Sequence, residues 1–303
     1  MAQRKIVVLG TGGTLAGTSS RPGDNVGYTA AQVGIADLVG AIPLLRGVPI
    51  ETEQVAQVDS KDMTRGVWDK LEDRCKHHLG REEVAGIVIT HGTDTIEETA
   101  FYLQEVLSPQ KPVVLTCAMR PATSLSPDGP QNIVDAVAVA TQEEACGVVV
   151  VCAGVIHDSR DVMKVHHYRL DPFSSGDAGP IGYVEEGEVR LVRNWPGDWI
   201  LYTRTAPVPL QRVEIVFSHA GASRDHVDAL VRSGVQGIVV ATTGNGTVHR
   251  ELMPALLDAQ KQGVKVLRAS RCAEGGVIAQ PGDELPSTNL SPVKARILLL
   301  LGG

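Results

Sequence analysis

The chain has 303 residues, of which 43% are hydrophobic and 21% are charged, and its formal net charge at pH 7 is −7. This composition is typical of an acidic soluble protein, and no basic stripe in the sequence suggests binding to nucleic acid or to a membrane. The length suffices for two unequal domains, each with a hydrophobic core of its own.

The sequence carries no recognisable export or metal-binding signal. An apolar run at residues 5–9 is too short for the hydrophobic region of a signal peptide, and no small-residue cleavage site follows it, so we expect a cytoplasmic protein. The five cysteines show no CxxC spacing, which indicates reduced core thiols. The pairs His77-His78 and His166-His167 lack a second Cys/His pair, so we predict no metal site.

A glycine-rich loop, GTGGT at residues 10–14, follows the strand expected at residues 5–9. The dinucleotide-binding fingerprint needs a third glycine where Leu15 stands and a helix that does not begin here, so a nucleotide site is disfavoured. The alternative is a glycine turn that lets a substrate approach the backbone, with N–H groups ready to bind an oxyanion. Thr14 then presents its hydroxyl as a candidate nucleophile.

Residues 16–29 are rich in Gly, Ser, Asp, Asn and Pro, which predicts a mobile flap. Tyr28 is the one aromatic residue in this segment. It can be a hinge anchor packed on the domain, or a closing flap can deliver its phenol to Thr14.

The stretch GIVITHGTDTIEETAFYLQEVL, at residues 86–107, joins a buried strand to a helix through a turn of reactive side chains. Asp94 or Thr95 is expected to cap the helix, and Glu97 and Glu98 are placed to complete a capping box. Thr93 and Asp94 follow the carboxyl end of a strand, where open α/β sheets bind ligands. These polar residues can be caps alone, but one cap suffices, so we favour a functional site.

Strands and helices alternate through the first half of the chain. Further strands are expected at residues 50–58, 113–117 and 147–152, and helices at residues 30–42, 63–79 and 131–144. This alternation predicts an α/β fold with a doubly wound, mainly parallel sheet. The strand ends at Thr14, Ser60, Thr93 and Ala118 are expected to open on one edge of that sheet.

The C-terminal third predicts a second, smaller α/β domain. We expect an N-terminal α/β domain at residues 1–192, which ends in a hairpin at 179–192, then a linker at residues 193–209 and a C-terminal domain at residues 210–303. In the last of these, strands are expected at residues 213–217, 237–240 and 264–267, and helices at residues 224–233, 249–262 and from residue 292 onward.

Several motifs in this order resemble the bacterial-type L-asparaginases of the asparaginase/glutaminase family across nearly the whole chain. They are TGGTLAG at residues 11–17, VDSKDM at 58–63, VITHGTDTIEETAFYL at 88–103, AMRPATSLSPDGPQN at 118–132, DVMK at 161–164, TGNGT at 243–247 and LSPVKARILL near the end. The resemblance implies a two-domain α/β fold and a cofactor-free amidohydrolase that converts asparagine to aspartate and ammonia, with minor glutaminase activity. It also implies a homotetramer built as a dimer of dimers.

The resemblance also assigns catalytic roles. Thr14 is similar to the nucleophile that attacks the side-chain amide, with Tyr28 of the flap beside it. Thr93, Lys164 and Asp94 resemble a second cluster of hydroxyl, amine and carboxylate, although Lys164 alone would be read as a solvated surface lysine. A desolvated lysine near a second hydroxyl can take the proton of a threonine nucleophile through a short relay.

Substrate-binding residues follow from the same resemblance. Ser60 and Asp94 resemble the residues that hold the α-carboxylate and α-amino groups, and the backbone of Ala118 resembles the contact to the leaving amide nitrogen. Thr247 and Glu284 match positions of the second domain that complete the site of a neighbouring subunit, although Asp283 can take the place of Glu284.

The turn at residues 59–61 distinguishes this chain from exported relatives, which commonly carry Gln or Glu where Lys61 stands. A lysine beside the substrate ammonium would be repelled by on the order of 4 kcal/mol at about 4 Å and an effective dielectric of about 20, so we expect Lys61 to point away. Asp59 would then be a second carboxylate for the ammonium. The alternative is that Asp59 only caps the following helix and pairs with Lys61 on the surface.

Two further functions are compatible with these motifs. The amidase subunit of a tRNA-dependent amidotransferase shares them, but we expect an additional N-terminal domain in that case. A non-catalytic amino-acid sensor could use the same cleft, yet binding alone does not need two hydroxyls and a lysine.

Overall fold

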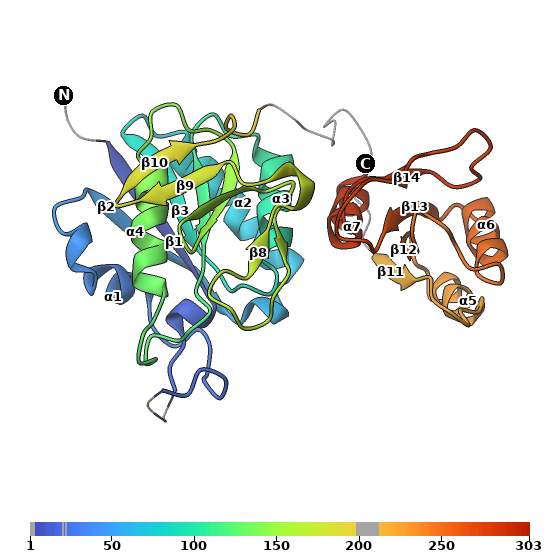
Figure 1. Cartoon of the computed structure of the whole chain (residues 1–303), viewed down its shortest axis with the longest axis horizontal. Helices are drawn as coiled ribbons and strands as arrows, with labels where there is room; N and C mark the ends of the chain where they lie inside the picture. The colour runs from blue at the N-terminus through green and yellow to red at the C-terminus, as the bar shows by residue number, and fades with distance from the viewer. Residues whose placement is uncertain (1–3, 20, 22, 198–211) are drawn as a thin grey trace. The chain divides into compact units, whose positions relative to one another are not determined.

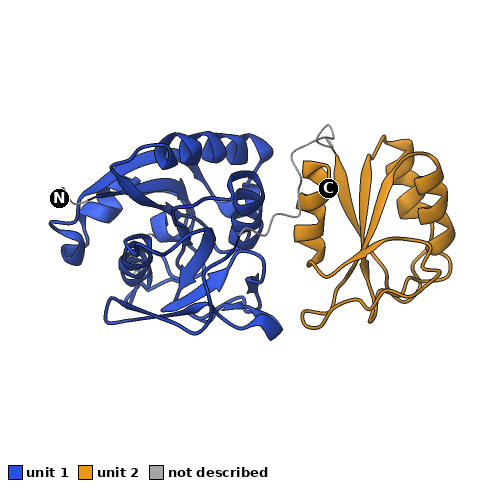
Figure 2. Cartoon of the chain, turned by 90° about the horizontal axis from the view of Figure 1, so that it is seen from above, with its two compact units in different colours: residues 1–199 blue, residues 200–303 orange. Residues whose placement is uncertain are grey.

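The computed structural model describes residues 4–19, 21, 23–197 and 212–303. The chain divides into two compact units, residues 1–199 and 200–303, which are coloured separately in Figure 2. Each unit has its own sheet and its own hydrophobic core. Most of the linker expected at residues 193–209 lies outside the described residues.

The described part of the first unit contains an eight-stranded sheet in the order β10-β9-β6-β5-β4-β3-β1-β2 (Figure 1). The strands are β1 (Lys5–Gly12), β2 (Ile50–Val58), β3 (Val84–Thr90), β4 (Val113–Thr116), β5 (Val148–Cys152), β6 (Val155–Asp158), β9 (Gly182–Glu185) and β10 (Glu188–Leu191). The five strands from β5 to β2 pair in parallel, whereas β6, β9 and β10 pair antiparallel at one edge. The predicted mainly parallel sheet is thus confirmed.

Helices cover both faces of this sheet (Figure 1). They are α1 (Ile35–Gly40), α2 (Arg65–Leu79), α3 (Ile96–Leu107) and α4 (Gly129–Ala140). Ile35 of α1 and Ile133 of α4 share one buried cluster with Ile6 and Val8 of β1. Because side chains alternate along a strand, Val7 and Leu9 point to the opposite face, where α2 and α3 pack.

Two helices begin later than their sequence pattern predicts. The helix expected from residue 30 starts only at Ile35, because Ala31, Gln32 and Val33 donate their N–H groups to carbonyls of residues 13 and 16 and hold the base of the flap. Similarly, α2 starts at Arg65, since a short 3-10 turn, Ser60–Asp62, precedes it. In contrast, α4 begins at Gly129, two residues early, with Pro130 in its first turn, where a missing N–H costs nothing.

The strand order creates a switch point at β1. β2 and β3 lie on opposite sides of β1, and the β1–β3 register pairs Gly10 with Thr90. The carboxyl ends of β1 and β3 are therefore neighbours, at the place where open α/β sheets bind their ligands. A small antiparallel ribbon, β7 (Met163–Lys164) with β8 (Phe173–Ser174), is separate from the main sheet.

The second unit is the predicted smaller α/β domain. Its described residues form the parallel strands β11 (Val213–Phe217), β12 (Gly237–Thr242), β13 (Lys265–Ser270) and β14 (Ser287–Thr288), in that order. Its helices are α5 (Asp225–Arg232), α6 (Met253–Lys261) and α7 (Pro292–Leu301).

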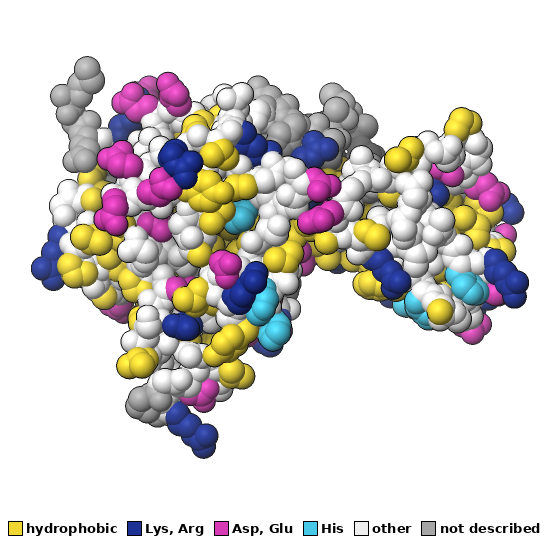
Figure 3. Space-filling model, viewed as in Figure 1, with side chains coloured by type: hydrophobic (Ala, Val, Ile, Leu, Met, Phe, Trp, Pro, Cys, Tyr) yellow, Lys and Arg dark blue, Asp and Glu magenta, His cyan; other side chains and the backbone are white. Residues whose placement is uncertain are grey.

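The distribution of charge on the surface and the lengths of the helices can be compared with the composition of the chain. On the face seen in Figure 3, the Lys and Arg side chains of the described residues are interspersed with Asp and Glu. Among the helices described, none is both long enough and apolar enough to cross a lipid bilayer.

Candidate active site

A cavity of about 280 Å³ lies at the carboxyl ends of the parallel strands in the first unit. Its walls are formed by Thr14, Asn25, Val26, Tyr28, Asp59, Ser60, Thr93, Asp94, Met119, Lys164, His167 and Tyr168. The structure thus brings together seven of the residues that the sequence singled out, from segments as far apart as the flap and the β7–β8 ribbon.

Thr14 reaches the cavity through a turn that only glycine can form. Gly12 and Gly13 have φ angles of 108° and 79°, and a Cβ on Gly13 would lie 2.5 Å from the backbone nitrogen of Gly92. This close approach packs the loop after β1 against the loop after β3. The Thr14 side chain lies at the start of the short 3-10 helix Thr14–Ala16 and is almost fully buried.

The flap residue Tyr28 is a hydrogen-bond partner of Thr14. The Thr14 Oγ1 and Tyr28 Oη atoms are 2.6 Å apart, and a backbone bridge between Thr18 and Thr29 closes the flap behind them. Burial raises the pKa of Tyr28, and the charges of Asp59 and Asp94 add to that effect against the opposing bond to Thr14. Tyr28 is therefore a protonated phenol at neutral pH.

Thr93, Asp94 and Lys164 form a second hydrogen-bonded cluster. The Lys164 Nζ atom donates to Thr93 Oγ1 at 2.8 Å and to Asp94 Oδ1 at 2.5 Å. The Lys164 side chain is 19% exposed, against 53% for Asp94. This lysine is thus not the solvated surface residue that its local sequence indicates.

The capping box predicted at the start of α3 is wrong. Thr95 occupies the cap position without a side-chain cap bond, because its hydroxyl donates instead to the Ser60 carbonyl at 2.8 Å. Glu97 accepts the backbone N–H of Lys164 at 2.8 Å. Both side chains serve partners that are distant in sequence, which a local pattern cannot reveal.

His91, which the sequence did not single out, makes hydrogen bonds within the turn after β3 and to α3. Its Nδ1–H donates to the Gly92 carbonyl at 2.8 Å, so its Nε2 accepts the Thr99 hydroxyl at 2.9 Å, and the Trp68 indole N–H donates to that hydroxyl at 2.9 Å. Complete burial lowers the pKa of His91 to about 4, against a weaker opposing effect of the bond to Gly92. The imidazole is therefore neutral. A histidine directly after a buried strand is the one sequence signal that could have indicated it.

Ser60 and Asp59 line the cavity from the turn after β2. Ser60 Oγ accepts the backbone N–H of Asp94 at 3.3 Å, which links this turn to the turn after β3. Asp59 is the cap residue of the 3-10 turn and accepts the Lys61 N–H at 3.4 Å. The Lys61 Nζ atom pairs with Asp59 at 3.1 Å and with Asp62 at 2.6 Å. Lys61 is not among the lining residues, in agreement with the expectation that it points away.

The loop after β4 is held by residues that the sequence did not single out. Both oxygens of Asp128 accept backbone N–H groups, of Met119 and Arg120, each at 2.9 Å. Asn132 donates to the Cys117 carbonyl at 2.9 Å. These bonds fix the backbone on either side of the buried Ala118, whose neighbour Met119 lines the cavity.

Two predicted site residues, Thr247 and Glu284, belong to the second unit. Thr247 lies in a turn in which its hydroxyl bonds Thr243, and its side chain is exposed. Glu284 is also exposed. The adjacent Asp283 is paired with the buried Arg268, with Nη2 and Oδ2 2.7 Å apart.

The geometry is suited to activating a hydroxyl group. Two threonines line one cavity, one bonded to a phenol and the other to an amine that contacts a carboxylate. A nucleophilic hydroxyl needs a neighbour that takes its proton. A deprotonated amine can take it directly, whereas a protonated phenol can only relay it, by giving its own proton to a further acceptor. Within the described residues, no three His, Cys, Asp or Glu side chains are grouped as a metal site requires.

Comparison with known proteins identifies the family. Two family models match, asparaginase N-terminal at residues 5–196 and glutaminase/asparaginase C-terminal domain at residues 212–302. L-asparaginase 2 of Escherichia coli (strain K12) is 37% identical over 99% of this chain and 89% of its own length, and the glutaminase-asparaginase of Pseudomonas fluorescens biotype A is 36% identical over 98% and 85%. The crystal structure of a probable cytoplasmic L-asparaginase from Campylobacter jejuni is similar with a TM-score of 0.92 at 38% identity, covering 99% of this chain and 94% of that one. The chain therefore belongs to the asparaginase family.

Proposed function

We propose that this protein hydrolyses the side-chain amide of L-asparagine to L-aspartate and ammonia. One observation carries the proposal: Thr14 with Tyr28, and Thr93 with Lys164 and Asp94, line the same cavity at the switch point of the sheet. The family relatives named as asparaginases support the choice of substrate.

The reaction would proceed in two steps through Thr14. Its Oγ1 gives its proton to a group of the site and attacks the amide carbon, the carbon–nitrogen bond breaks, and the nitrogen takes up a proton from the site and leaves as ammonia. The resulting ester on Thr14 is then attacked by water, which gives aspartate and returns a proton to the Thr14 oxygen. The proposed groups that move these protons are Tyr28, which is hydrogen-bonded to Thr14, and the Thr93–Lys164 pair, which lines the same cavity.

The ends of the substrate would be held by the remaining walls of the cavity. Ser60 offers a hydroxyl to the α-carboxylate, whereas Asp94 and Asp59 offer carboxylates to the α-ammonium group. The backbone at Ala118, which Asp128 and Asn132 fix from behind, would contact the leaving amide nitrogen. Minor activity on L-glutamine is part of the proposal, because a relative is named glutaminase-asparaginase.

The second unit would contribute to the site of a neighbouring subunit. Thr247 and Glu284 are the proposed contacts, in a homotetramer arranged as a dimer of dimers. Between the two adjacent acids, Glu284 is favoured, because Asp283 is already paired with Arg268 and accepts the N–H of Gln280. We further propose a cytoplasmic location, a term that the name of the Campylobacter jejuni neighbour includes.

Ammonia release from L-asparagine by the purified protein tests the proposal. Wild-type protein should release ammonia without an added metal or nucleotide, and Thr14→Ala should lose several orders of magnitude of kcat. The control is Thr141→Ala, an exposed threonine beyond the end of α4, which should keep full activity. Binding of L-asparagine without any ammonia release by the wild type would instead support a sensor.

A further inference from the structure

Lys164 is held at both ends by one short segment of the chain. Its side-chain Nζ atom contacts Thr93 and Asp94, and its backbone N–H donates to Glu97 Oε2 at 2.8 Å. All three acceptors lie within residues 93–97, the turn after β3 and the first turn of α3. The position of the amine is therefore defined relative to this segment.

The ribbon that carries Lys164 is short and separate from the main sheet. β7 and β8 are two residues long each and, among the strands that the structure describes, pair only with one another, Met163 with Ser174 and Lys164 with Phe173. An isolated two-stranded ribbon is marginally stable at best, even when its strands are longer. The bond from Glu97 joins the ribbon to α3, whose Ile96, Ala100 and Leu103 are completely buried.

The observed contact of Glu97 differs from the capping-box role that its position in the sequence suggests. Glu97 and Glu98 both lie in the first turn of α3, where a negative charge favours the helix dipole, and the side chain of the cap residue Thr95 makes no cap hydrogen bond. The two acids thus make a similar contribution to the helix. Glu97 in addition accepts the backbone N–H of Lys164.

We propose that Glu97 is a positioning residue for Lys164. Its carboxylate fixes the backbone of the lysine so that the amine reaches Thr93 and Asp94. Glu97 itself is not among the residues that line the cavity, so we place its effect on Lys164 and not on the substrate. The inference rests on the proposed catalytic role of Lys164.

This role predicts a loss in kcat with little change in KM. A displacement of about 1 Å in a catalytic group can cost about 100-fold in rate. Glu97→Met keeps the length and the helix propensity of the side chain but cannot accept this bond, so its kcat should fall roughly 10-fold to 100-fold. Glu97→Gln keeps a carbonyl oxygen that can accept the same N–H without a charge, and it should recover most of that loss.

The experiment compares Glu97→Met, Glu97→Gln, Glu98→Gln and Lys164→Met by steady-state ammonia release from L-asparagine, with the pH profile of kcat and the melting temperature of each. Glu98→Gln is the matched control, because it removes one charge from the same helical turn. We expect near wild-type kcat for Glu98→Gln and Glu97→Gln, a reduced kcat for Glu97→Met, and an unshifted pH profile for Glu97→Gln. Glu97→Ala replaces the methionine variant if the latter does not fold.

Full kcat in Glu97→Met would overturn the inference, and so would equal losses in Glu97→Met and Glu97→Gln, which would indicate an effect of charge on the amine. These outcomes differ from failure of the proposed function. In that case Lys164→Met would keep full activity, or the wild type would release no ammonia.

Discussion

The hydroxyl of Thr14 and the phenol of Tyr28 are 2.6 Å apart, although a 14-residue step along the chain separates them. The flap that spans this interval bends back through the Thr18–Thr29 bridge, and a Cβ on Gly17 would lie 2.8 Å from the Tyr28 ring. The phenol is therefore packed against the base of its own flap while it contacts the candidate nucleophile. Of the two interpretations of Tyr28, hinge anchor and catalytic partner, the geometry allows both at once.

Tyr28→Phe separates these two roles, because it keeps the ring and removes only the hydroxyl. We expect kcat for L-asparagine to fall by about 100-fold or more, since proton transfer by a positioned group typically contributes that much. The melting temperature should change little. Tyr183→Phe, on β9, is the control and should keep wild-type kinetics. Unchanged kcat in Tyr28→Phe would leave Tyr28 as an anchor only.

The sequence predicts those site residues well whose position depends only on the strand that they follow. Thr14 and Thr93 each follow a strand that is almost wholly buried, and parallel strands must bring their carboxyl ends to one edge. In contrast, the roles of Thr95 and Glu97 could not be predicted. The capping-box pattern is satisfied equally well by two local bonds, but the side chains bond Ser60, 35 residues away, and Lys164, 67 residues away. Such partners depend on how the elements pack.

A mixing experiment tests whether two chains share each site. Thr14→Ala and a Glu284 variant that is itself inactive carry their lesions in different units, so a hybrid dimer has one site with neither lesion. After random exchange at equal amounts, roughly a quarter of wild-type activity should return. Lack of recovery after exchange has been verified by native mass spectrometry would place the whole site within one chain.

The ion pair between Asp59 and Lys61 leads to a prediction about the affinity for L-asparagine. Asp59 lines the cavity and also contacts Lys61 Nζ at 3.1 Å, so its charge is shared between the ammonium site and the surface. We expect Asp59→Ala to raise KM for L-asparagine at least about tenfold, which corresponds to about 1.4 kcal/mol. Lys61→Gln should change KM little, because Lys61 does not line the cavity. A KM unaffected by the first substitution would reduce Asp59 to a cap of the turn.

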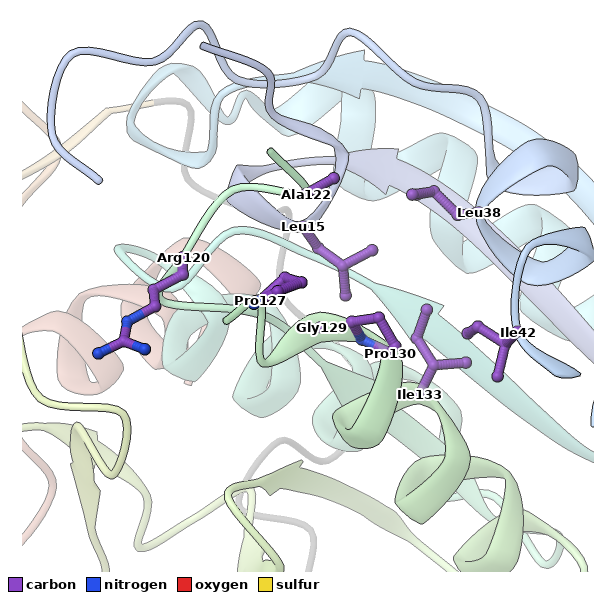
Figure 4. Close-up of a pocket in the computed structure, with 9 residues that line it drawn as sticks. All are labelled: Leu15, Leu38, Ile42, Arg120, Ala122, Pro127, Gly129, Pro130 and Ile133. Carbon is purple, nitrogen blue, oxygen red and sulfur yellow. The ribbon is translucent and has the colours of Figure 1, made fainter. Parts of the chain in front are cut away.

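A small cavity beside Leu15 leaves room for a side chain at one glycine, Gly129. It has a volume of about 30 Å³ and lies between Leu15, Ile133 and Gly129, as Figure 4 shows. A Cβ on Gly129 would lie 3.0 Å from Leu15 Cγ, and Leu15 can move into the empty space. Because Gly129 begins α4 in an ordinary helical conformation, Gly129→Ala should stabilise the protein by about 0.4 to 1 kcal/mol through the unfolded chain.

Urea denaturation measures this difference, and Gly13→Ala is the contrasting variant. A Cβ on Gly13 would meet the backbone of Gly92 at 2.5 Å, and its φ of 79° disfavours any side chain, so this change should destabilise the protein and abolish activity. A loss of stability in Gly129→Ala would mean that the Leu15 side chain cannot move away from the added methyl group.

The lowered pKa of His91 makes the free energy of unfolding depend on pH. Burial lowers the pKa of His91 to about 4 in the folded protein, whereas the unfolded chain has the ordinary value of 6.5. Between these two values the unfolded chain binds a proton that the folded protein rejects, so the free energy of unfolding falls as the pH falls through this window. Below about pH 4 both states are protonated, and His91 causes no further loss.

The expected loss from this one residue between about pH 7 and about pH 5 is on the order of 2 kcal/mol. Other groups titrate in the same range, so the test is the difference between the wild type and His91→Gln, measured by urea denaturation at fixed protein concentration. The variant is expected to be less stable at about pH 7, because a buried polar network has lost its centre, but its stability should fall less on acidification. Parallel pH dependences in the two proteins would show that His91 is protonated as readily in the fold as in the unfolded chain.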